Sequence, residues 1–316
     1  MGVNLIYGAF YKYHKPRKLL KYLYDHIDQD TLEIDMINFS GPNFAHVDNR
    51  LMSLQLIRND MTDAVMFGPD GNNLLPAAVL YKKNILALRG SFRPVTKVNM
   101  DMFQKSYEIF VREQTVDPKN AIVIFEITLS NLKSSGEIDE QDFMDRAELL
   151  CSLGQTVMIS KFSEYYKLVE YFNNFTKARI GLTMGVNNLE DIFDEKYYRH
   201  LSGGILEAFG KLFFKDLKVY LYPMMNPDTG QIMTSNNIKV HPRMKELYKF
   251  FKYNGKVMDI IDYDPDILNV FSRDVLKKIV NGEPGWEEML PEGVADIIKE
   301  KHLFLPKKGE AAPIFE

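Results

Sequence analysis

The sequence predicts an α/β protein, because hydrophobic segments of strand length alternate along the chain with helical patterns. Eight strand segments precede residue 225, and each is hydrophobic nearly throughout, which is typical of strands covered on both faces. Eight βα units favour a (β/α)8 barrel, whose usual size is about 250 residues. An open doubly wound parallel sheet uses the same strands and is the alternative.

The elements follow from periodicity. Helical segments carry their apolar residues on one face, as Val47, Leu51 and Leu54 do in the segment that ends at Arg58. Strands are expected at Val3–Ala9, Leu32–Phe39, Asp63–Gly68, Asn84–Gly90, Ala121–Leu129, Thr156–Lys161, Ala178–Val186 and Lys218–Met224. Helices are expected at Arg17–Ile27, Val47–Arg58, Met102–Arg112, Asp139–Ser152, Glu164–Phe175, Asn188–Tyr198 and Gly204–Phe214.

The composition changes after the eighth strand. Pro223, Pro227 and Gly230 mark a turn-rich connection, and helical patterns resume near Pro242. We therefore predict an α/β domain over residues 1–225, which carries the ligand site, and a mainly helical C-terminal region over residues 226–316, which packs on it. The last residues, 306–316, are expected to be loosely ordered.

Composition narrows the class of partner. The 316 residues are 46% hydrophobic and 26% charged, which predicts a soluble globular protein with a large core. A formal net charge of -4 disfavours nucleic acid as a partner, and no stretch approaches the roughly 20 apolar residues of a membrane span. The single cysteine, Cys151, indicates a reducing compartment, so the cytoplasm is expected. The sequence leaves open whether the protein forms a homo-oligomer.

Polar residues at the expected strand ends indicate an anionic small-molecule ligand. Arg89, Ser91 and Arg93 follow the fourth strand, and guanidinium groups beside a Gly-Ser turn suit phosphate or carboxylate. A structural arginine pair is an equally good interpretation of these residues. A second candidate is Ser202-Gly203-Gly204, whose small residues would expose helix amides, although a plain N-cap by Ser202 explains them too.

Acidic residues give no diagnostic metal spacing. Asp35, Glu126 and Glu207 are scattered along the chain. We predict no tightly held structural metal.

The segment Tyr7–Arg17 resembles the first strand and turn of the nicotinate-mononucleotide adenylyltransferase family, whose pattern is G-x-F-x-P-x-H-x-G-H. Gly8, Phe10 and His14 match, and Arg17 stands where the family has its second histidine. The resemblance implies transfer of an adenylyl group from ATP, with Mg2+, to a mononucleotide. It assigns Gly8 to the phosphates and makes His14 and Arg17 the catalytic residues.

A second segment near the C-terminus is similar to the I-S-S-T-x-I-R signature of that family. Ser272 matches and Lys277 stands in for the arginine, whereas Arg273 and Asp274 replace the second Ser and the Thr. The resemblance implies that Ser272 and Lys277 bind phosphates. It continues over about thirty residues of tail, through Ile279, Gly282, Leu290, Pro291, Val294, Ile298, Leu303 and Phe304.

Over nearly its whole length the chain resembles a bacterial family of longer, poorly characterised proteins that carry automatic labels such as nicotinate-nucleotide adenylyltransferase. The shared segments are Gly41-Pro42, Val47–Gln55, Tyr81–Lys83, Arg89–Thr96 and Phe271–Val275. Members have a further domain ahead of the segment that matches Gly2. The resemblance implies a missing N-terminal domain.

Three functional hypotheses follow. The first is a nucleotide-handling transferase of NAD biosynthesis that uses ATP with Mg2+ on His14, Arg17, Ser272 and Lys277. The second is an enzyme that acts on a phosphorylated or carboxylated small molecule held by Arg89, Ser91 and Arg93. The third is a non-catalytic binding or scaffold protein, which the altered signatures suggest. Adjacency of His14 and Ser272 would favour the first.

Overall fold

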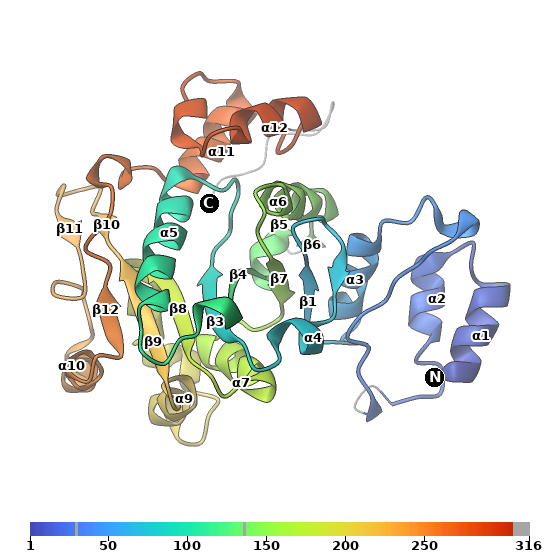
Figure 1. The fold of residues 1–316 in the computed structure, drawn as a ribbon, viewed down its shortest axis with the longest axis horizontal. Helices are drawn as coiled ribbons and strands as arrows, with labels where there is room; N and C mark the ends of the chain where they lie inside the picture. The colour runs from blue at the N-terminus through green and yellow to red at the C-terminus, as the bar shows by residue number, and fades with distance from the viewer. Residues whose placement is uncertain (29–30, 135–136, 306–316) are drawn as a thin grey trace. The chain divides into compact units, whose positions relative to one another are not determined.

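A computed structural model describes residues 1–28, 31–134 and 137–305 of the chain. It shows a mixed α/β fold with a mostly parallel sheet of eight strands (Figure 1). The chain divides into two compact units. Unit 1 comprises Met1–Val79 and Glu126–Lys161, and unit 2 comprises Leu80–Phe125 and Phe162–Glu316.

Unit 2 contains a row of four parallel strands in the order β12, β9, β8, β3. Their bounds are β3 Asn84–Arg89, β8 Ile180–Gly185, β9 Leu217–Tyr222 and β12 Val257–Asp259. The helices of the unit are α5 Lys97–Val111, α7 Tyr165–Phe175, α8 Val186–Ile192, α9 Gly204–Leu212, α10 Lys245–Tyr253, α11 Ser272–Asn281 and α12 Val294–Lys301. A short hairpin pairs β10 Met224–Met225 with β11 Ile232–Met233.

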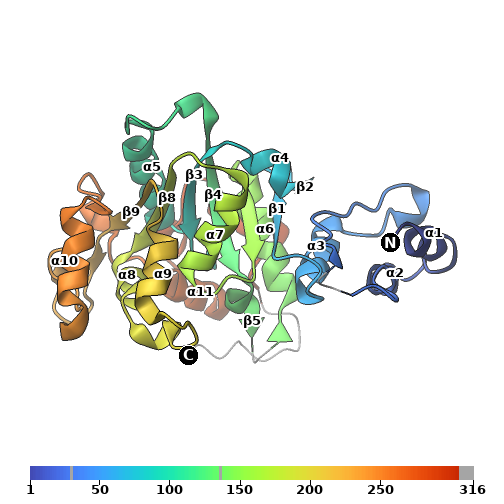
Figure 2. The ribbon, with the colours of Figure 1, turned by 90° about the horizontal axis from the view of Figure 1, so that it is seen from below.

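Helices cover both faces of this row. Figure 2 shows α5 on one side of β3, β8 and β9, and α7 and α9 on the other. Close packing of α5 explains a glycine inside β8: a Cβ on Gly181 would lie 2.7 Å from Tyr220 and 3.1 Å from Phe110 of α5. Because side chains alternate along a strand, Thr183 and Gly185 face α5 with Gly181.

Unit 1 contains the antiparallel strands β1 Ala64–Phe67, β2 Asn73–Leu74 and β7 Val157–Ser160, in the order β7, β1, β2. A two-residue ladder joins β5 Lys133–Ser134 to β6 Glu137–Ile138. The helices are α1 Gly2–Tyr11, α2 Pro16–Tyr22, α3 Asn49–Arg58 and α6 Glu140–Ser152. Strand β4, Ala121–Thr128, and helix α4, Pro76–Leu80, run across the boundaries between the units.

The structure shows no closed barrel among the described residues. Strand β12 pairs with β9 alone, and β2 pairs with β1 alone, so both are edge strands. The predicted (β/α)8 barrel is therefore corrected to an open sheet, with which the doubly wound alternative is compatible. The antiparallel pairing of β1 with β7 also departs from the predicted all-parallel order.

Six of the eight predicted strands are present, as β1, β3, β4, β7, β8 and β9. The prediction for Val3–Ala9 is wrong, because these residues form helix α1. The segment Leu32–Phe39 has no strand ladder. Side-chain amides hold it instead: Asn49 bonds to both the N–H and the C=O of Phe39, and Asn73 donates to the carbonyl of Ile37.

The region after residue 226 contains α10, α11 and α12 together with β11 and β12. It belongs to the same unit as β3, β8 and β9. No helix among the described residues is long and apolar enough to cross a membrane.

Candidate functional site

The order of strands in unit 2 reverses between β3 and β8. From β3 the chain passes through α5 to β4, on one side, whereas from β8 it passes through α8 and α9 to β9, on the other side. The two connections cover opposite faces of the sheet (Figure 2). Open α/β sheets bind ligands in the crevice that such a reversal leaves at the carboxyl ends of the strands. We therefore take the segments that follow β3 and β8 as the candidate site.

The turn after β3 is fixed by a folded-back aromatic ring. Phe92 has a positive φ of 46°, is 3% exposed, and packs against Phe125 with ring centroids 5.2 Å apart. Its ring lies over Gly90, where a Cβ would be 2.9 Å from the Phe92 Cζ. A side chain at position 90 would therefore displace the buried ring of Phe92.

This turn brings Arg89, Ser91 and Arg93 to the carboxyl edge of β3. Arg89 donates from Nη1 to the carbonyl of Ser163 at 3.0 Å, and its guanidinium lies 4.4 Å from the ring centroid of Tyr165. Stacking and a backbone bond orient the guanidinium plane. Ser91 is exposed and Arg93 is half-buried.

The N-terminus of the helix that follows the turn, α5, is capped by side chains of the same segment. Thr96 is the N-cap of α5 and forms a capping box with Asn99, whose Oδ1 accepts from the Thr96 amide at 2.9 Å. Lys97, the first residue of α5, is exposed. Strand, turn and helix therefore follow one another from Asn84 to Val111.

The end of β9 is tied to α5 and to the loop after β12. Tyr222 donates to Asp101 Oδ2 at 2.6 Å, and the amide of Asp264 donates to the same oxygen at 3.2 Å. Burial, reinforced by the bond to Asp101, raises the pKa of Tyr222, so its hydroxyl stays protonated. Lys105 of α5 also pairs with Asp262 at 2.9 Å. These bonds fix the start of α5 to the carboxyl ends of two neighbouring strands.

Ser272 and Lys277 lie in α11, in the same unit as the Gly90 turn. Ser272 is the first residue of the helix, Lys277 is exposed, and Asp274 lies 3.8 Å from Arg273 Nε. In Figure 1 both α11 and the start of α5 lie toward the end to which β3 points. The tail positions behind the resemblance are core residues, because Ile279, Leu290, Val294, Ile298, Leu303 and Phe304 are all buried.

The segment Ser202-Gly203-Gly204 precedes α9, as predicted from its small residues. However, the Gly203 amide donates to Glu207 Oε2 at 2.9 Å, and this backbone bond, with Lys211, lowers the pKa of Glu207. The Gly203 amide, which the anion hypothesis expected to bind a ligand, thus already donates to the carboxylate of Glu207.

Gly8, His14 and Arg17 lie in unit 1. They do not form the strand–turn–helix arrangement that the family pattern describes. Gly8 is inside α1 and packs against Leu19, His14 is exposed in the turn before α2, and Arg17 is in α2. Arg17 pairs with Glu140 through two bonds of 3.0 and 2.5 Å. The segment is a helix–turn–helix, and its match to the pattern has a different backbone. His14 and Ser272 belong to different units.

Comparisons with known proteins give limited information. No family model matches the chain, and no curated protein matches it. Among the solved structures that are similar to this chain, two are of nicotinic acid mononucleotide adenylyltransferase from Plasmodium falciparum, one complexed with NaAD and one with APC. They are 13% and 12% identical, with TM-scores of 0.43 and 0.40, and each alignment covers 70% of this chain and 97% of the other.

The structure also locates a match that sequence reasoning overlooked. The turn after β3 matches the pattern G-x-F-x-P-x-H-x-G-H at three of its six fixed positions, which are Gly90, Phe92 and Pro94. Thr96 and Asn99 stand at the two histidine positions, and Val98 at the second glycine. The signal was the glycine, phenylalanine and proline spacing directly after a buried strand, but the missing histidines concealed it.

Proposed function

We propose that unit 2 binds a nucleoside triphosphate at the carboxyl ends of β3 and β8 and transfers its nucleotidyl group to the phosphate of a mononucleotide. The observation that carries this proposal is the reversal of strand order between β3 and β8, next to the Gly90 turn. The glycine, phenylalanine and proline of that turn, in a strand–turn–helix, add support.

Phosphate binding would rest on the turn. Arg89 and Arg93 carry guanidinium groups whose forks match phosphate oxygens, and the exposed Ser91 offers a hydroxyl between them. The buried Phe92 ring packs over Gly90 in the middle of the turn, which would help to preorganise the three groups. Asn187 and Asn188 lie in the first turn of α8, directly after β8, and would meet the nucleoside.

The transfer needs charge and position more than proton transfer. A phosphate oxygen of the acceptor attacks the α-phosphorus of the triphosphate, a new P–O bond forms, and the bond to the bridging oxygen breaks. Its electron pair leaves with pyrophosphate. Because the attacking phosphate is already ionised, no general base is required.

Thr96 and Asn99 cannot carry positive charge, and both are engaged in the capping box of α5. The charge that builds up on pyrophosphate must therefore be met by the cations of the turn, Arg89 and Arg93, and by Lys97. Mg2+ would enter as part of the nucleotide substrate. Among the described residues, no group of three His, Cys, Asp or Glu side chains is arranged to hold a metal ion.

The test is a pyrophosphate-release assay on the full chain with MgATP and nicotinate mononucleotide. We expect Arg89→Ala and Arg93→Ala each to lower kcat/KM by about 100-fold, because each removes a donor to developing charge. Arg243→Ala, an exposed arginine of the same unit, should leave the rate unchanged. Thermal unfolding of each variant separates lost chemistry from lost fold.

His14→Ala distinguishes the two sites. On the present proposal it changes the rate less than twofold, whereas the N-terminal match predicts that it abolishes activity. Absence of pyrophosphate release from the folded wild-type chain would contradict the proposal. Turnover of a phosphorylated or carboxylated small molecule without ATP, lost in Arg89→Ala, would instead favour the second hypothesis.

A further inference from the structure

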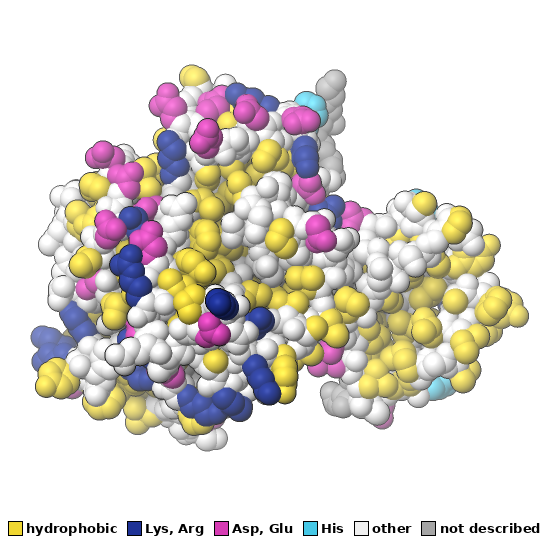
Figure 3. All heavy atoms as spheres, in the orientation of Figure 1, with side chains coloured by type: hydrophobic (Ala, Val, Ile, Leu, Met, Phe, Trp, Pro, Cys, Tyr) yellow, Lys and Arg dark blue, Asp and Glu magenta, His cyan; other side chains and the backbone are white. Residues whose placement is uncertain are grey.

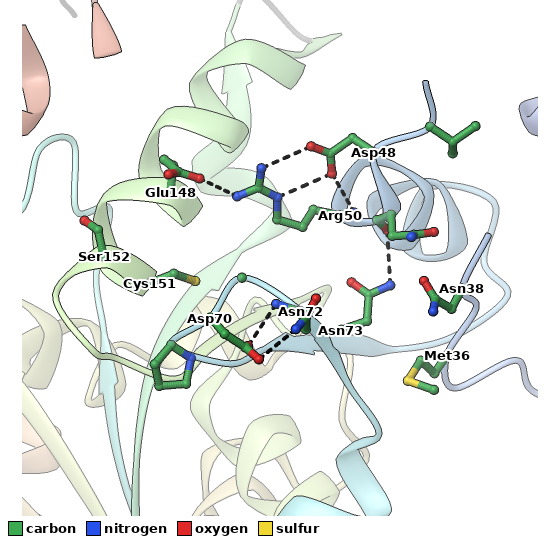
Figure 4. A pocket seen from close by; sticks show the side chains of 14 residues that line it. Met36, Asn38, Asp48, Arg50, Asp70, Asn72, Asn73, Glu148, Cys151 and Ser152 are labelled. Atoms are coloured by element: carbon green, nitrogen blue, oxygen red, sulfur yellow. Dashed lines mark hydrogen bonds and ion pairs between the residues drawn. The ribbon is translucent and has the colours of Figure 1, made fainter. Parts of the chain in front are cut away.

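Unit 1 contains a polar pocket of about 650 Å³ that the proposed transferase function does not use (Figure 4). Its walls come from the segment around Asn38, the start of α3, the turn between β1 and β2, and the end of α6. All of these elements belong to unit 1. The volume is within the range of roughly 300–1,000 Å³ that small-molecule sites occupy.

Among the described residues that line the pocket, the one cation is Arg50, and two carboxylates pair with it. Arg50 donates from Nη1 to Glu148 at 2.6 Å, and from Nη2 and Nε to Asp48 at 3.1 and 3.3 Å. Burial disfavours the charged form, but the bonds to Asp48 and Glu148 outweigh it and raise the pKa of Arg50. The guanidinium is therefore fully charged and bound on two sides.

A third carboxylate, Asp70, is held in place in the turn between β1 and β2. Asp70 accepts from the Asn72 amide at 3.0 Å and from the Asn72 side chain at 2.7 Å, and these bonds lower its pKa. Asp70 therefore stays ionised on the pocket wall, and Arg50 Nη1 lies 3.7 Å from the position that a Cβ of the neighbouring Gly71 would take.

A buried acceptor completes this wall. Asn73 uses its Nδ2 to donate to the carbonyls of Ile37 and Asn49, at 2.9 and 3.2 Å. Its Oδ1 is buried and has no hydrogen-bond partner within the described part of the chain. A buried carbonyl oxygen without a donor is costly, so a donor is expected to reach it. Figure 4 shows Asp70, Asn72 and Asn73 side by side on the wall.

The charge balance excludes anions. Three carboxylates, Asp48, Asp70 and Glu148, and one guanidinium line the pocket, so three negative charges less one positive charge leave a balance of two negative charges. Burial raises the pKa of the neighbouring Cys151 thiol to about 11, so the thiol adds no further charge. A phosphate or carboxylate would be repelled, and the pocket therefore differs in chemistry from the Gly90 turn.

We infer that this pocket binds a small organic cation, an aliphatic amine whose ammonium group donates to Asp70 and to the carbonyl oxygen of Asn73. An ammonium group has three donors and no acceptor, which complements the acceptor oxygens of Asp70 and Asn73. Its attraction to the carboxylates is strengthened because the pocket is partly enclosed.

The test uses three four-carbon probes on the full chain: putrescine, 1,4-butanediol and succinate. They match in length and differ only in carrying ammonium, hydroxyl or carboxylate groups. Ligand-observed saturation-transfer NMR should detect putrescine and neither of the others, and added salt should weaken the signal. Equal binding of butanediol, or binding of none of the three, would overturn the inference.

Variants place the amine in the pocket. Asp70→Asn should weaken putrescine by about tenfold or more, because it removes a charge-assisted bond. Asp25→Asn changes an exposed aspartate of the same unit and should have no effect. If both variants bound putrescine like the wild type, the amine would be on the surface and the assignment would be wrong. Because Asp70 is exposed in a turn, Asp70→Asn should fold normally.

Discussion

At the residue scale, single side chains shape the turn at Gly90 and the pocket of unit 1. Gly90 and Phe92 show this best, because the ring of Phe92 lies against the position that a Cβ of residue 90 would take. The sequence identified Arg89, Ser91 and Arg93 as the ligand candidates but did not reveal the packing of Phe92 over Gly90 between them. That packing depends on a ring folding back, which no spacing reveals.

A methyl group at position 90 should therefore displace the Phe92 ring and distort the turn. We expect Gly90→Ala to lower pyrophosphate release by at least about tenfold, measured as kcat/KM, since misplaced phosphate-binding groups lose transition-state contacts. Gly210→Ala is the matched control, because a Cβ there meets nothing within 4 Å, and its α9 helix should if anything be stabilised. Wild-type activity in Gly90→Ala would remove the turn from the site.

Cys151 offers a pH-dependent prediction. Its pKa is raised from 9.0 to about 11 by burial, so near pH 8 the native thiolate fraction is about 100-fold below that of the unfolded chain. The native protein also gains protons relative to the unfolded chain between these two pKa values, so stability falls as pH rises from 9 to 11. Because the native thiolate is scarce and buried, iodoacetamide labelling, followed by mass spectrometry, should be far slower in native protein than in guanidinium. Equal rates would show an accessible, ionised thiol.

At the element scale, helix α1 illustrates how one sequence pattern suits two structures. Val3, Ile6 and Phe10 are consistent with a buried strand, yet they also repeat at helical spacing. In the structure they are exposed on α1, which packs on α2 through Gly8 (Figure 3 shows hydrophobic side chains gathered over these two helices). Nothing local to the segment distinguishes the alternatives, and neighbouring residues decide between them.

Because these side chains are exposed, charged replacements should cost little. We expect Ile6→Lys with Phe10→Lys to change the free energy of unfolding by no more than about 0.5 kcal/mol per site. Leu20→Ala, in α2, should cost about 2–5 kcal/mol, since Leu20 is fully buried. Urea unfolding measures both, and a large loss in the double lysine variant would show that α1 buries this face.

A buried ion-pair network ties the amino end of β8 to neighbouring elements of unit 2. Arg179 donates to Asp216 at 2.5 Å and lies 3.1 Å from Glu113, which also pairs with Lys218 at 2.6 Å. Arg179→Ala should destabilise the protein by about 2 kcal/mol, because it removes the ion-pair partner of Asp216 and one of the two partners of Glu113. Lys249→Ala, in an exposed pair, should cost under about 0.5 kcal/mol. Similar losses in the two denaturation curves would contradict the network.

At the scale of the whole molecule, the chain is organised by contacts that sequence order does not reveal. Alternating strands and helices predicted the α/β class, six of the eight strands, and the helices α2, α3, α5, α6, α7, α8 and α9, but not α1, which was predicted as a strand. The two units, however, are each built from separated stretches, and β1 pairs antiparallel with β7 across about ninety residues. The amine pocket depends on such pairing, because α6 and the β1–β2 turn meet only in the fold.

The central claim is that the nucleotide binds in unit 2, between the carboxyl ends of β3 and β8. Hydrogen–deuterium exchange with and without saturating MgATP tests it most directly. We predict slower exchange of backbone amides in residues 90–99 and 185–188 on addition of nucleotide, and no change in residues 8–17. Protection confined to residues 8–17, or no protection at any position, would contradict the account.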